Sequence, residues 1–377
     1  MGVCFSSPPP PSAGIGADTI IASTSASFKS APAPAAAPPA PLARVDPKQF
    51  KSEDDFKRQY QMRGVLGEGS YSVVRKATDN FTNAQVAIKV VDRKKLTPED
   101  EVALRIEVEI LAKLRHAHVI QLYDWYGAPS TYYLALEYMQ GGELFERIVQ
   151  REFYSEYDAK EVVLVLTRVL QYLHVQHKIC HRDLKPENIL LASHDSSNDA
   201  DGIKIADFGF AKPFGNNELT SACGTPGYVA PEIISGKSYG ASVDVWSVGV
   251  ITFILLCGYP PFYSANQKDL FKLIREGRFK FESPYWDKVS GDAKEFITNC
   301  LKVHVADRYT VNDMLQSKWL VQEAKRDDLR SALLELKKFN ARRKLRAAIK
   351  AAIAANRMAD IAAGVRSFVS AQKAIGH

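Results

Sequence analysis

The stretch "HRDLKPEN", residues 181–188, decides how this chain of 377 residues is interpreted. It places Asp183, Lys185 and Asn188 within six positions. The motifs "DFG" at 207–209 and "APE" at 230–232 follow it in that order. Carboxylate and amide oxygens are the ligands that a hard divalent cation prefers. Chance agreement of several separated motifs is negligible, so the residues upstream are interpreted together with these.

Upstream, "VLGEGSYSVV" at 65–74 places glycines between two short β-branched stretches. This strand-turn-strand pattern differs from the strand-turn-helix of a dinucleotide site, and glycines there let backbone N–H groups approach phosphate oxygens. "VAIKVV" at 86–91 then carries one cation, Lys89, among apolar neighbours. A buried lysine needs an anionic partner, and Glu107 in the helical stretch 105–114 is the best candidate. Alone, the two patterns would also fit an ordinary hairpin and a surface lysine.

Together the motifs resemble the eukaryotic protein kinase family, because residues 60–320 carry every family motif in order and at family-like spacing. The resemblance implies an α+β fold of two lobes, with a small β-rich N-lobe, a larger helical C-lobe and a site for ATP and Mg²⁺. Lys185, together with "GTPGY" at 224–228, favours serine or threonine over tyrosine as acceptor. We therefore expect transfer of the ATP γ-phosphate to protein hydroxyl groups.

The resemblance also assigns roles to single residues. Asp183 would orient the substrate hydroxyl and accept its proton, while Lys185 would steady the transferring phosphoryl group. Lys89, fixed by Glu107, would contact the ATP phosphates. Asn188 and Asp207 would hold Mg²⁺. The glycine-rich turn, the apolar adenine slot and the backbone groups that bind adenine would comprise Leu66, Gly67, Gly69, Ser72, Val74, Ala87, Leu136, Glu137, Met139 and Leu190. Ser72 stands where a third glycine is common, which predicts altered loop flexibility and not inactivity.

Two glutamates resemble residues that select the substrate. Glu143 and Glu187 correspond to positions that bind an arginine three residues before the acceptor in kinases that prefer basic substrates. Glu143 could instead bind only the ATP ribose, and both interpretations stay open. Protein substrates with upstream basic residues are therefore expected.

Other matches concern regulation and bracing. Ser221 falls where type I calcium/calmodulin-dependent kinases have an activating phosphoacceptor, Thr220 is its neighbour, and Arg182 is the cation that would pair with the phosphate. An upstream activating kinase is implied if Ser221 is used, and an unmodified polar loop is the alternative. The residues expected to brace the C-lobe are Thr225, through a contact to Asp183, Asp244, and a Glu232–Arg308 ion pair.

Composition limits the remaining classes of function. The net charge of +6 comes from the end of the chain, because residues 320–377 hold thirteen Lys and Arg but five Asp and Glu. This distribution argues against a nucleic-acid-binding face. Five widely spaced cysteines indicate a reduced intracellular protein without a cysteine zinc site. The run "VGVITFILLCG" at 248–258 is too short to span a bilayer and predicts a buried core helix.

The N-terminal residues 1–55 predict a disordered arm, because ten of the nineteen prolines lie in the first 50 residues with Ala and Ser between them. Its first residues match a myristoylation pattern, with Gly2 as acceptor and Cys4 available for palmitoylation. A cytoplasmic protein anchored to a membrane by two acyl chains would follow. The Ser- and Ala-rich arm also fits an organelle transit peptide, or an arm that is not modified.

The C-terminal residues 321–363 contain no Gly or Pro and predict one long helix, with 364–377 as a tail. Leu329, Leu333 and Leu336 form one apolar stripe, and Leu345, Ile349 and Ile353 form a second. The string "LKKFNARRKL" at 336–345 resembles the autoinhibitory, calmodulin-binding segment of type II calcium/calmodulin-dependent kinases. The implied calmodulin contacts are Phe339, Arg342, Arg343, Lys344, Leu345, Ile349 and Ile353.

Two departures from the type II segment limit the resemblance. Ala332 replaces an autophosphorylated threonine, and Ile353 must replace the strictly matching Ala354 as an anchor. No calcium loop is recognisable in the sequence, so Ca²⁺ would act only through calmodulin. An active kinase whose basic tail binds anionic membrane is a second hypothesis. A catalytically dead scaffold is a third, and the intact motif residues oppose it.

Overall fold

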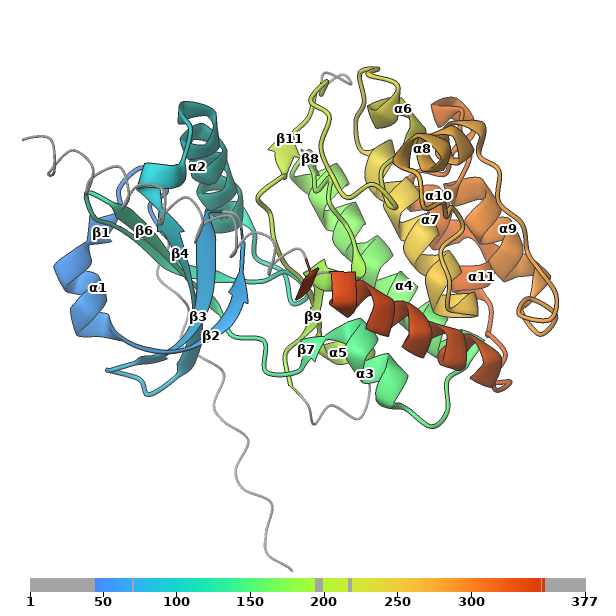
Figure 1. Ribbon diagram of the computed structural model, residues 1–377, viewed down its shortest axis with the longest axis horizontal. Helices are drawn as coiled ribbons and strands as arrows, with labels where there is room; N and C mark the ends of the chain where they lie inside the picture. The colour runs from blue at the N-terminus through green and yellow to red at the C-terminus, as the bar shows by residue number, and fades with distance from the viewer. Residues whose placement is uncertain (1–44, 70, 194–198, 216–218, 347, 350–377) are drawn as a thin grey trace, which may run out of the picture. The chain divides into compact units, whose positions relative to one another are not determined.

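The computed structural model describes residues 45–69, 71–193, 199–215, 219–346 and 348–349. Its first lobe is built on a six-stranded sheet with the order β1-β5-β6-β4-β3-β2 (Figure 1). Every neighbouring pair in this sheet is antiparallel except β1 and β5, which are parallel. The strands are β1 (Lys51–Ser52), β2 (Tyr60–Glu68), β3 (Ser72–Asp79), β4 (Gln85–Asp92), β5 (Leu122–Gly127) and β6 (Thr131–Glu137).

Helix α2 (Pro98–Lys113) packs beside this sheet and carries Glu107. Its start is fixed by a capping box, in which the Thr97 and Asp100 side chains each bond to the other residue's backbone N–H. Leu104, Val108 and Leu111 are buried and recur at intervals of three and four residues, so they form the inner face of the helix. Glu107 is the buried acid on that face. A short 3₁₀ turn, η1 (Arg93–Lys95), precedes the helix.

The second lobe is mainly helical, which confirms the predicted α+β fold with a β-rich and a larger helical lobe. At its centre lies α7 (Ser242–Cys257), and all but its first residue are buried. The predicted core helix at 248–258 is therefore confirmed. Around α7 lie α3 (Leu144–Gln150), α4 (Glu156–Gln171), the π-helical turn η2 (Tyr172–Gln176), α5 (Asp199–Gly202), α6 (Pro231–Ile234), α8 (Gln267–Glu276), α9 (Gly291–Cys300), η4 (Val305–Asp307), α10 (Val311–Gln316) and α11 (Lys318–Val321). Among the described residues, no helix combines the length and the apolar character needed to cross a membrane.

Short strands position the motif residues between the lobes. One small sheet has the order β10-β9-β7, formed by β7 (Gly142–Glu143), β9 (Ile189–Leu191) and β10 (Ile203–Ile205). The other pairs β8 (Ile179–Cys180) with β11 (Lys212–Pro213). The stretch 181–188 runs from β8 through the turn η3 (Pro186–Asn188) into β9. The paired strands therefore hold both ends of this stretch, and β10 leads directly into the DFG motif.

Two expected boundaries are wrong. The expected disordered arm 1–55 is ordered from residue 45, because β1 pairs with β5 and α1 (Glu53–Gln59) buries Phe56. The helix expected from 321 begins only at 330, because residues 322–329 run as an extended linker along the start of α4. Backbone N–H groups of Tyr157 and Leu329 donate to the carbonyls of Lys325 and Tyr154 across this contact. Residues beyond 349 lie outside the described ranges.

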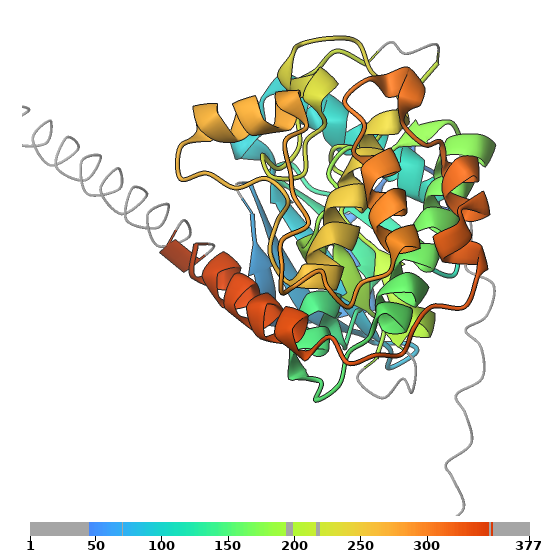
Figure 2. The same ribbon diagram turned by 90° about the vertical axis from the view of Figure 1, so that its right-hand side faces the viewer.

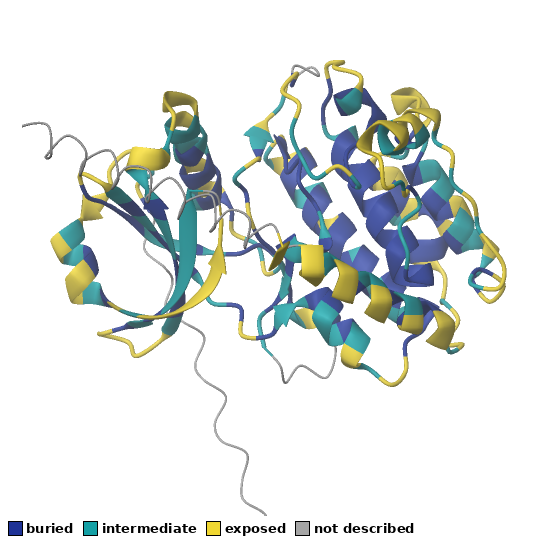
Figure 3. Ribbon diagram, in the orientation of Figure 1, coloured by how far each residue is buried: buried dark blue, intermediate teal, exposed yellow. Residues whose placement is uncertain are grey.

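The C-terminal helix, residues 330–346, lies along the second lobe with one face inward (Figures 2 and 3). Leu329, Leu333 and Leu336 are 1–3% exposed, so the first predicted stripe is docked. The docking is close at Gly258, where an added Cβ would lie 2.5 Å from the Leu336 backbone nitrogen. Ala332, at 1% exposure, belongs to the same contact. Only a residue without a side chain lets the two helices approach in this way.

Candidate active site

Lys89 of β4 and Glu107 of α2 form the ion pair that the sequence predicts. The Lys89 Nζ lies 2.7 Å from one Glu107 carboxylate oxygen and 2.9 Å from the other. Burial alone would lower the pKa of the Lys89 ammonium, but the negative charges of Glu107 and Asp207 outweigh it and hold the pKa above its ordinary value. Lys89 is therefore a fixed cation that faces the DFG aspartate.

The catalytic stretch is held by Asp244 at the start of α7, as expected. Its buried carboxylate accepts hydrogen bonds of 2.8 Å from the backbone N–H groups of both His181 and Arg182. His174 contacts the same carboxylate at 2.8 Å. Burial alone would raise the pKa of Asp244, but the hydrogen bond to His174 and the backbone bonds outweigh it and keep the pKa below its usual value. Arg182 adopts a φ of 69°, a strained conformation that such surroundings must maintain.

A buried ion pair braces the lobe behind this stretch. The Arg308 guanidinium donates to both Glu232 carboxylate oxygens at 2.7 and 2.9 Å, which confirms the predicted pair. Removal of either partner would leave a buried charge uncompensated. These two residues therefore support the site without belonging to it.

Asp183 lies at the centre of a small polar network. Its carboxylate accepts a hydrogen bond from the Thr225 hydroxyl at 2.8 Å, the contact that the sequence predicts, and lies 2.5 Å from the Lys185 Nζ. The Asn188 side-chain amide donates to the Asp183 carbonyl at 2.8 Å. Asp183 is 3% exposed, so its carboxylate is held in one place by partners from two segments. Such a positioned carboxylate can orient a hydroxyl and accept its proton.

Asp207 and Asn188 supply oxygen ligands of the kind that a divalent cation prefers. Asp207 is exposed and adopts a φ of 61°, and the next residue, Phe208, is buried with its ring 4.9 Å from that of His181. Because the Asn188 amide nitrogen is used by Asp183, its amide oxygen is the atom that can serve a cation. In the described ranges, no three His, Cys, Asp or Glu side chains form a metal site by themselves. Asp207 and Asn188 would therefore share a bound cation with nucleotide phosphates, whose charge it would neutralise.

The expected nucleotide residues lie where the first sheet meets the segment that leaves β6. Leu66, Gly67 and Gly69 lie at the end of β2 or just after it, and Ser72 and Val74 lie on β3. Ala87 on β4 pairs with Leu136 on β6, and Met139 follows that strand. Leu190 lies on β9 in the other lobe. The Glu137 carboxylate pairs with Lys204 at 2.9 Å, and its backbone N–H donates to the Gln121 carbonyl at 2.9 Å, so the nucleotide contact expected of its backbone falls to the carbonyl.

Glu143 and Glu187 lie together and both contact Arg343 of the C-terminal helix. One Arg343 nitrogen pairs with the Glu143 carboxylate and another lies 3.3 Å from Glu187. Burial raises the pKa of Glu143, although Arg343 acts in the opposite direction. The contact shows that Glu143 can bind a guanidinium, while its predicted ribose contact stays a prediction. Sequence reasoning missed Glu146, which pairs with Lys344, although its i,i+3 spacing from Glu143 was a usable signal.

The activation-loop candidates lie beside Arg182. The Arg182 guanidinium donates to the Ser221 hydroxyl at 3.0 Å, and Thr220 is exposed next to it. Tyr239, which sequence reasoning did not identify, donates its hydroxyl to the Ser221 carbonyl at 2.7 Å. A phosphate on Ser221 would therefore meet a cation that is already in place.

Some of the remaining predicted regulatory residues lie in the described ranges, and the others lie outside them. Phe339 is half-buried and packs on the core, whereas Arg342 is exposed. Leu345 and Ile349 are 61% and 49% exposed, so this part of the second stripe is open to solvent and accessible to a partner. Ile353, Gly2 and Cys4 lie outside the described residues.

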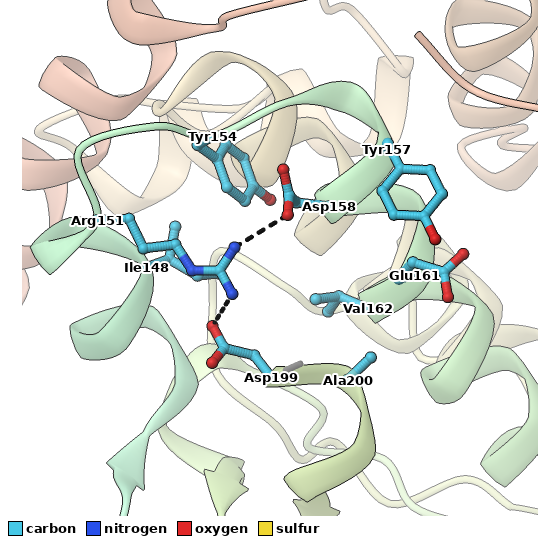
Figure 4. A pocket seen from close by; sticks show the side chains of 9 residues that line it. All are labelled: Ile148, Arg151, Tyr154, Tyr157, Asp158, Glu161, Val162, Asp199 and Ala200. Carbon is cyan, nitrogen blue, oxygen red and sulfur yellow. Dashed lines mark hydrogen bonds and ion pairs between the residues drawn. The ribbon is translucent and has the colours of Figure 1, made fainter. Parts of the chain in front are cut away.

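A small pocket between α3, α4 and α5 is separate from this site (Figure 4). Arg151 crosses it, 2.9 Å from Asp158 and 2.6 Å from Asp199, and Tyr154 lines it nearby. Its volume of about 20 Å³ has room for roughly one water molecule. It is a structural ion-pair site and not a ligand pocket.

Comparison with known proteins agrees with the geometry. The protein kinase domain model matches residues 60–320. Calcium/calmodulin-dependent protein kinase type 1 of Macrobrachium nipponense is 42% identical over 284 residues, which cover 75% of this chain and 81% of that protein. The same kinase of Caenorhabditis elegans is 40% identical over 79% of this chain and 85% of that one. A probable myosin light chain kinase of Dictyostelium discoideum is 40% identical over 76% of this chain and 72% of that one. The chain therefore belongs to the protein kinase family, as an ATP- and metal-dependent serine/threonine kinase of the calcium/calmodulin-dependent kinase group.

Proposed function

We propose that this kinase is held inactive by its own C-terminal helix and is activated when calcium-loaded calmodulin removes that helix. The observation that carries the proposal is the contact of Arg343 with Glu143 and Glu187. These are the two acids expected to bind the upstream arginine of a protein substrate. A helix that occupies them competes directly with a basic substrate.

The buried stripe explains how the helix reaches these acids. Leu329, Leu333 and Leu336 dock on the lobe, and the close approach at Gly258 fixes where along the helix this contact falls. Arg343 lies seven residues after Leu336, which is two helical turns on the same face. Lys344 pairs with Glu146 beside it. The apolar docking therefore supports the contacts of Arg343 and Lys344 with the three glutamates.

Release requires a partner that binds the helix better than the kinase does. Leu345 and Ile349 are exposed apolar residues among cations, which is the pattern that calmodulin binds with acidic rims and Met-lined pockets. Phe339 packs on the kinase, so a partner that takes all three anchors must displace the helix. The names of the type 1 relatives point to the same regulator.

The experiment compares peptide phosphorylation by the full chain with and without calcium/calmodulin. We expect low activity without calmodulin and high activity with it. A chain ending at residue 329 keeps the linker that bonds to Tyr154 and Tyr157 and should be active in both conditions. Equal activity of the full chain in every condition would contradict autoinhibition. Activity released by anionic vesicles and not by calmodulin would favour the membrane hypothesis.

Arg343→Ala and Arg342→Ala form a matched pair of variants. Both remove one positive charge, but only Arg343 contacts the two glutamates, because Arg342 is exposed. Arg343→Ala should raise calmodulin-independent activity about fivefold to thirtyfold, as expected for the loss of about 1–2 kcal/mol from a half-buried charge contact. Arg342→Ala should leave that activity unchanged.

The N-terminus supports a separate proposal about location. Met1-Gly2 and Cys4 fit acylation, and an acylated chain would be held on a membrane from the cytoplasmic side. An organelle transit peptide and an unmodified arm are the alternatives. Metabolic labelling of wild type and Gly2→Ala with myristate separates acylation from both.

A further inference from the structure

Residues 45–59 wrap around the edge of the first sheet, and this segment is called the N-terminal clamp. Its strand β1 lies beside β5, with Lys51 opposite Tyr126 and Ser52 opposite Gly127. Val45 and Phe50 lie on one face of the sheet. On the other face, Phe56 of α1 packs against Tyr133, with ring centroids 4.1 Å apart. The segment is therefore attached to both faces of the sheet.

Trp125 of β5 contacts the first half of the clamp and holds it in place. This residue is fully buried, and its indole N–H lies 3.1 Å from the backbone carbonyls of both Asp46 and Gln49. The Phe50 ring meets it edge-on, with ring centroids 5.4 Å apart. A backbone segment bonded in this way adopts one path across the strand.

Gly127 is shaped for this path. A Cβ added there would lie 2.5 Å from the Phe50 ring atom Cε2, which is closer than real side chains approach. Any other residue at 127 would push Phe50 away from the sheet. The glycine and the phenylalanine therefore form one fitted contact.

The contact continues to helix α2 through Tyr132. The Phe50 ring lies 5.7 Å from the Tyr132 ring, and the Tyr132 hydroxyl donates to Glu101 of α2 at 2.6 Å. The Arg93 guanidinium lies 4.4 Å from the centre of the same ring and 3.5 Å from Glu101. Tyr132 thus joins the clamp to the first half of the helix that carries Glu107.

We propose that the N-terminal clamp holds α2 in the position in which Glu107 meets Lys89, with Phe50 as a positioning residue for nucleotide binding. Glu107 lies six residues, or less than two turns, beyond Glu101 on one rigid helix. The Lys89–Glu107 pair needs atoms within about 3 Å, so a small shift of the helix separates it. When the Phe50 ring is removed, the Tyr132 ring loses a packing contact. The hydrogen bond from the Tyr132 hydroxyl then holds Glu101 less firmly. The proposed effect is on the binding of ATP, and it does not depend on the autoinhibition proposed for the C-terminal helix.

The experiment uses full-length chains that carry Phe50→Ala, Phe50→Tyr or Gly127→Ala. Affinity for Mg–ATP and hydrogen exchange in residues 98–113 are measured for each. Phe50→Ala and Gly127→Ala should each weaken Mg–ATP binding about threefold to tenfold and speed exchange in α2, with exchange in α7 unchanged. Phe50→Tyr keeps the ring, and because residue 50 is 40% exposed there is room for the added hydroxyl. This variant should match wild type in both measurements.

Matched controls separate positioning from general destabilisation. Phe81→Ala removes a ring that is 74% exposed, and Gly64→Ala adds a Cβ with nothing within 4 Å. Both should behave like wild type. The double variant Phe50→Ala/Gly127→Ala should be no worse than Phe50→Ala, because both act on one contact. Unchanged Mg–ATP affinity and α2 exchange in Phe50→Ala would overturn the proposal, as would an equal rise of exchange in α2 and α7.

Discussion

The two segments that flank the kinase motifs are attached in different ways. The N-terminal clamp is joined to the first lobe by backbone pairing of β1 with β5 and by the two Trp125 bonds to backbone carbonyls. The C-terminal helix is joined to the second lobe by side chains, through one apolar stripe and the pairs that Arg343 and Lys344 form. A helix satisfies its own backbone bonds, so it can leave without exposing unpaired groups. The clamp cannot leave in this way, because its backbone is bonded to β5 and to Trp125. The helix is therefore suited to act as a switch, and the clamp to act as a fixed part of the lobe.

The largest expected effect is on kcat, from a substitution at the active site on which both segments are proposed to act. Asp183→Asn removes the carboxylate that Thr225 and Lys185 hold. We expect a loss of about 10²- to 10⁴-fold in kcat, the range of general acid–base catalysis. Peptide phosphorylation is measured in the full chain with calmodulin and in the chain ending at residue 329. Persistent activity in either would mean that the site assignment is wrong.

The next effect tests the docking of the switch from the kinase side. Gly258→Ala places a Cβ against the backbone of the C-terminal helix, and should raise calmodulin-independent activity about fivefold to fiftyfold. Gly236→Ala is the control, because Gly258 and Gly236 have φ values of 86° and 65° but only Gly258 faces the helix. Both variants place a side chain on a residue with a left-handed backbone, at a cost of about 1–2 kcal/mol each. Equal basal activity of the two variants would contradict a docked inhibitory helix.

A smaller effect separates the switch from the activation loop. Phosphate on Ser221 would pair with Arg182, 3.0 Å from the Ser221 hydroxyl, and order the loop. Ser221→Ala should therefore remove an activation of about threefold to tenfold that an upstream kinase gives to the calmodulin-bound chain. Thr220→Ala should keep it. If Ser221→Ala is activated like wild type by the same kinase, Ser221 is not the switch residue.

The smallest effect on catalysis is expected at the first residues. Gly2→Ala should abolish myristate incorporation in cells and leave kcat of the purified chain unchanged, because Gly2 is not among the residues assigned to the active site, which lie between 66 and 207. Labelling and peptide phosphorylation are measured on the same preparations. Incorporation into both wild type and Gly2→Ala would show that the label is not on Gly2.

The class of reaction could be predicted from the motifs alone. Lys89, Asp183, Asn188 and Asp207 are residues of the types that phosphoryl transfer needs, and their motifs are contiguous enough to be recognised without a fold. The α7 core helix and the Lys89–Glu107 pair were also predictable, since a run of apolar residues must be buried and a buried cation needs an anion. These inferences depend on properties that a few neighbouring residues carry.

The contacts of the flanking segments could not be predicted from the sequence. Residues 45–59 follow a proline-rich stretch and have little apolar surface, yet Phe50 and Phe56 are ordered because β5 offers an edge and two aromatic clusters. Residues 322–329 look helical but run extended, because their backbone groups bond to the start of α4, more than 160 residues earlier. The meeting of Arg343 with Glu143 spans 200 positions. Such contacts depend on which surfaces the fold brings together, and no local pattern of residues encodes them.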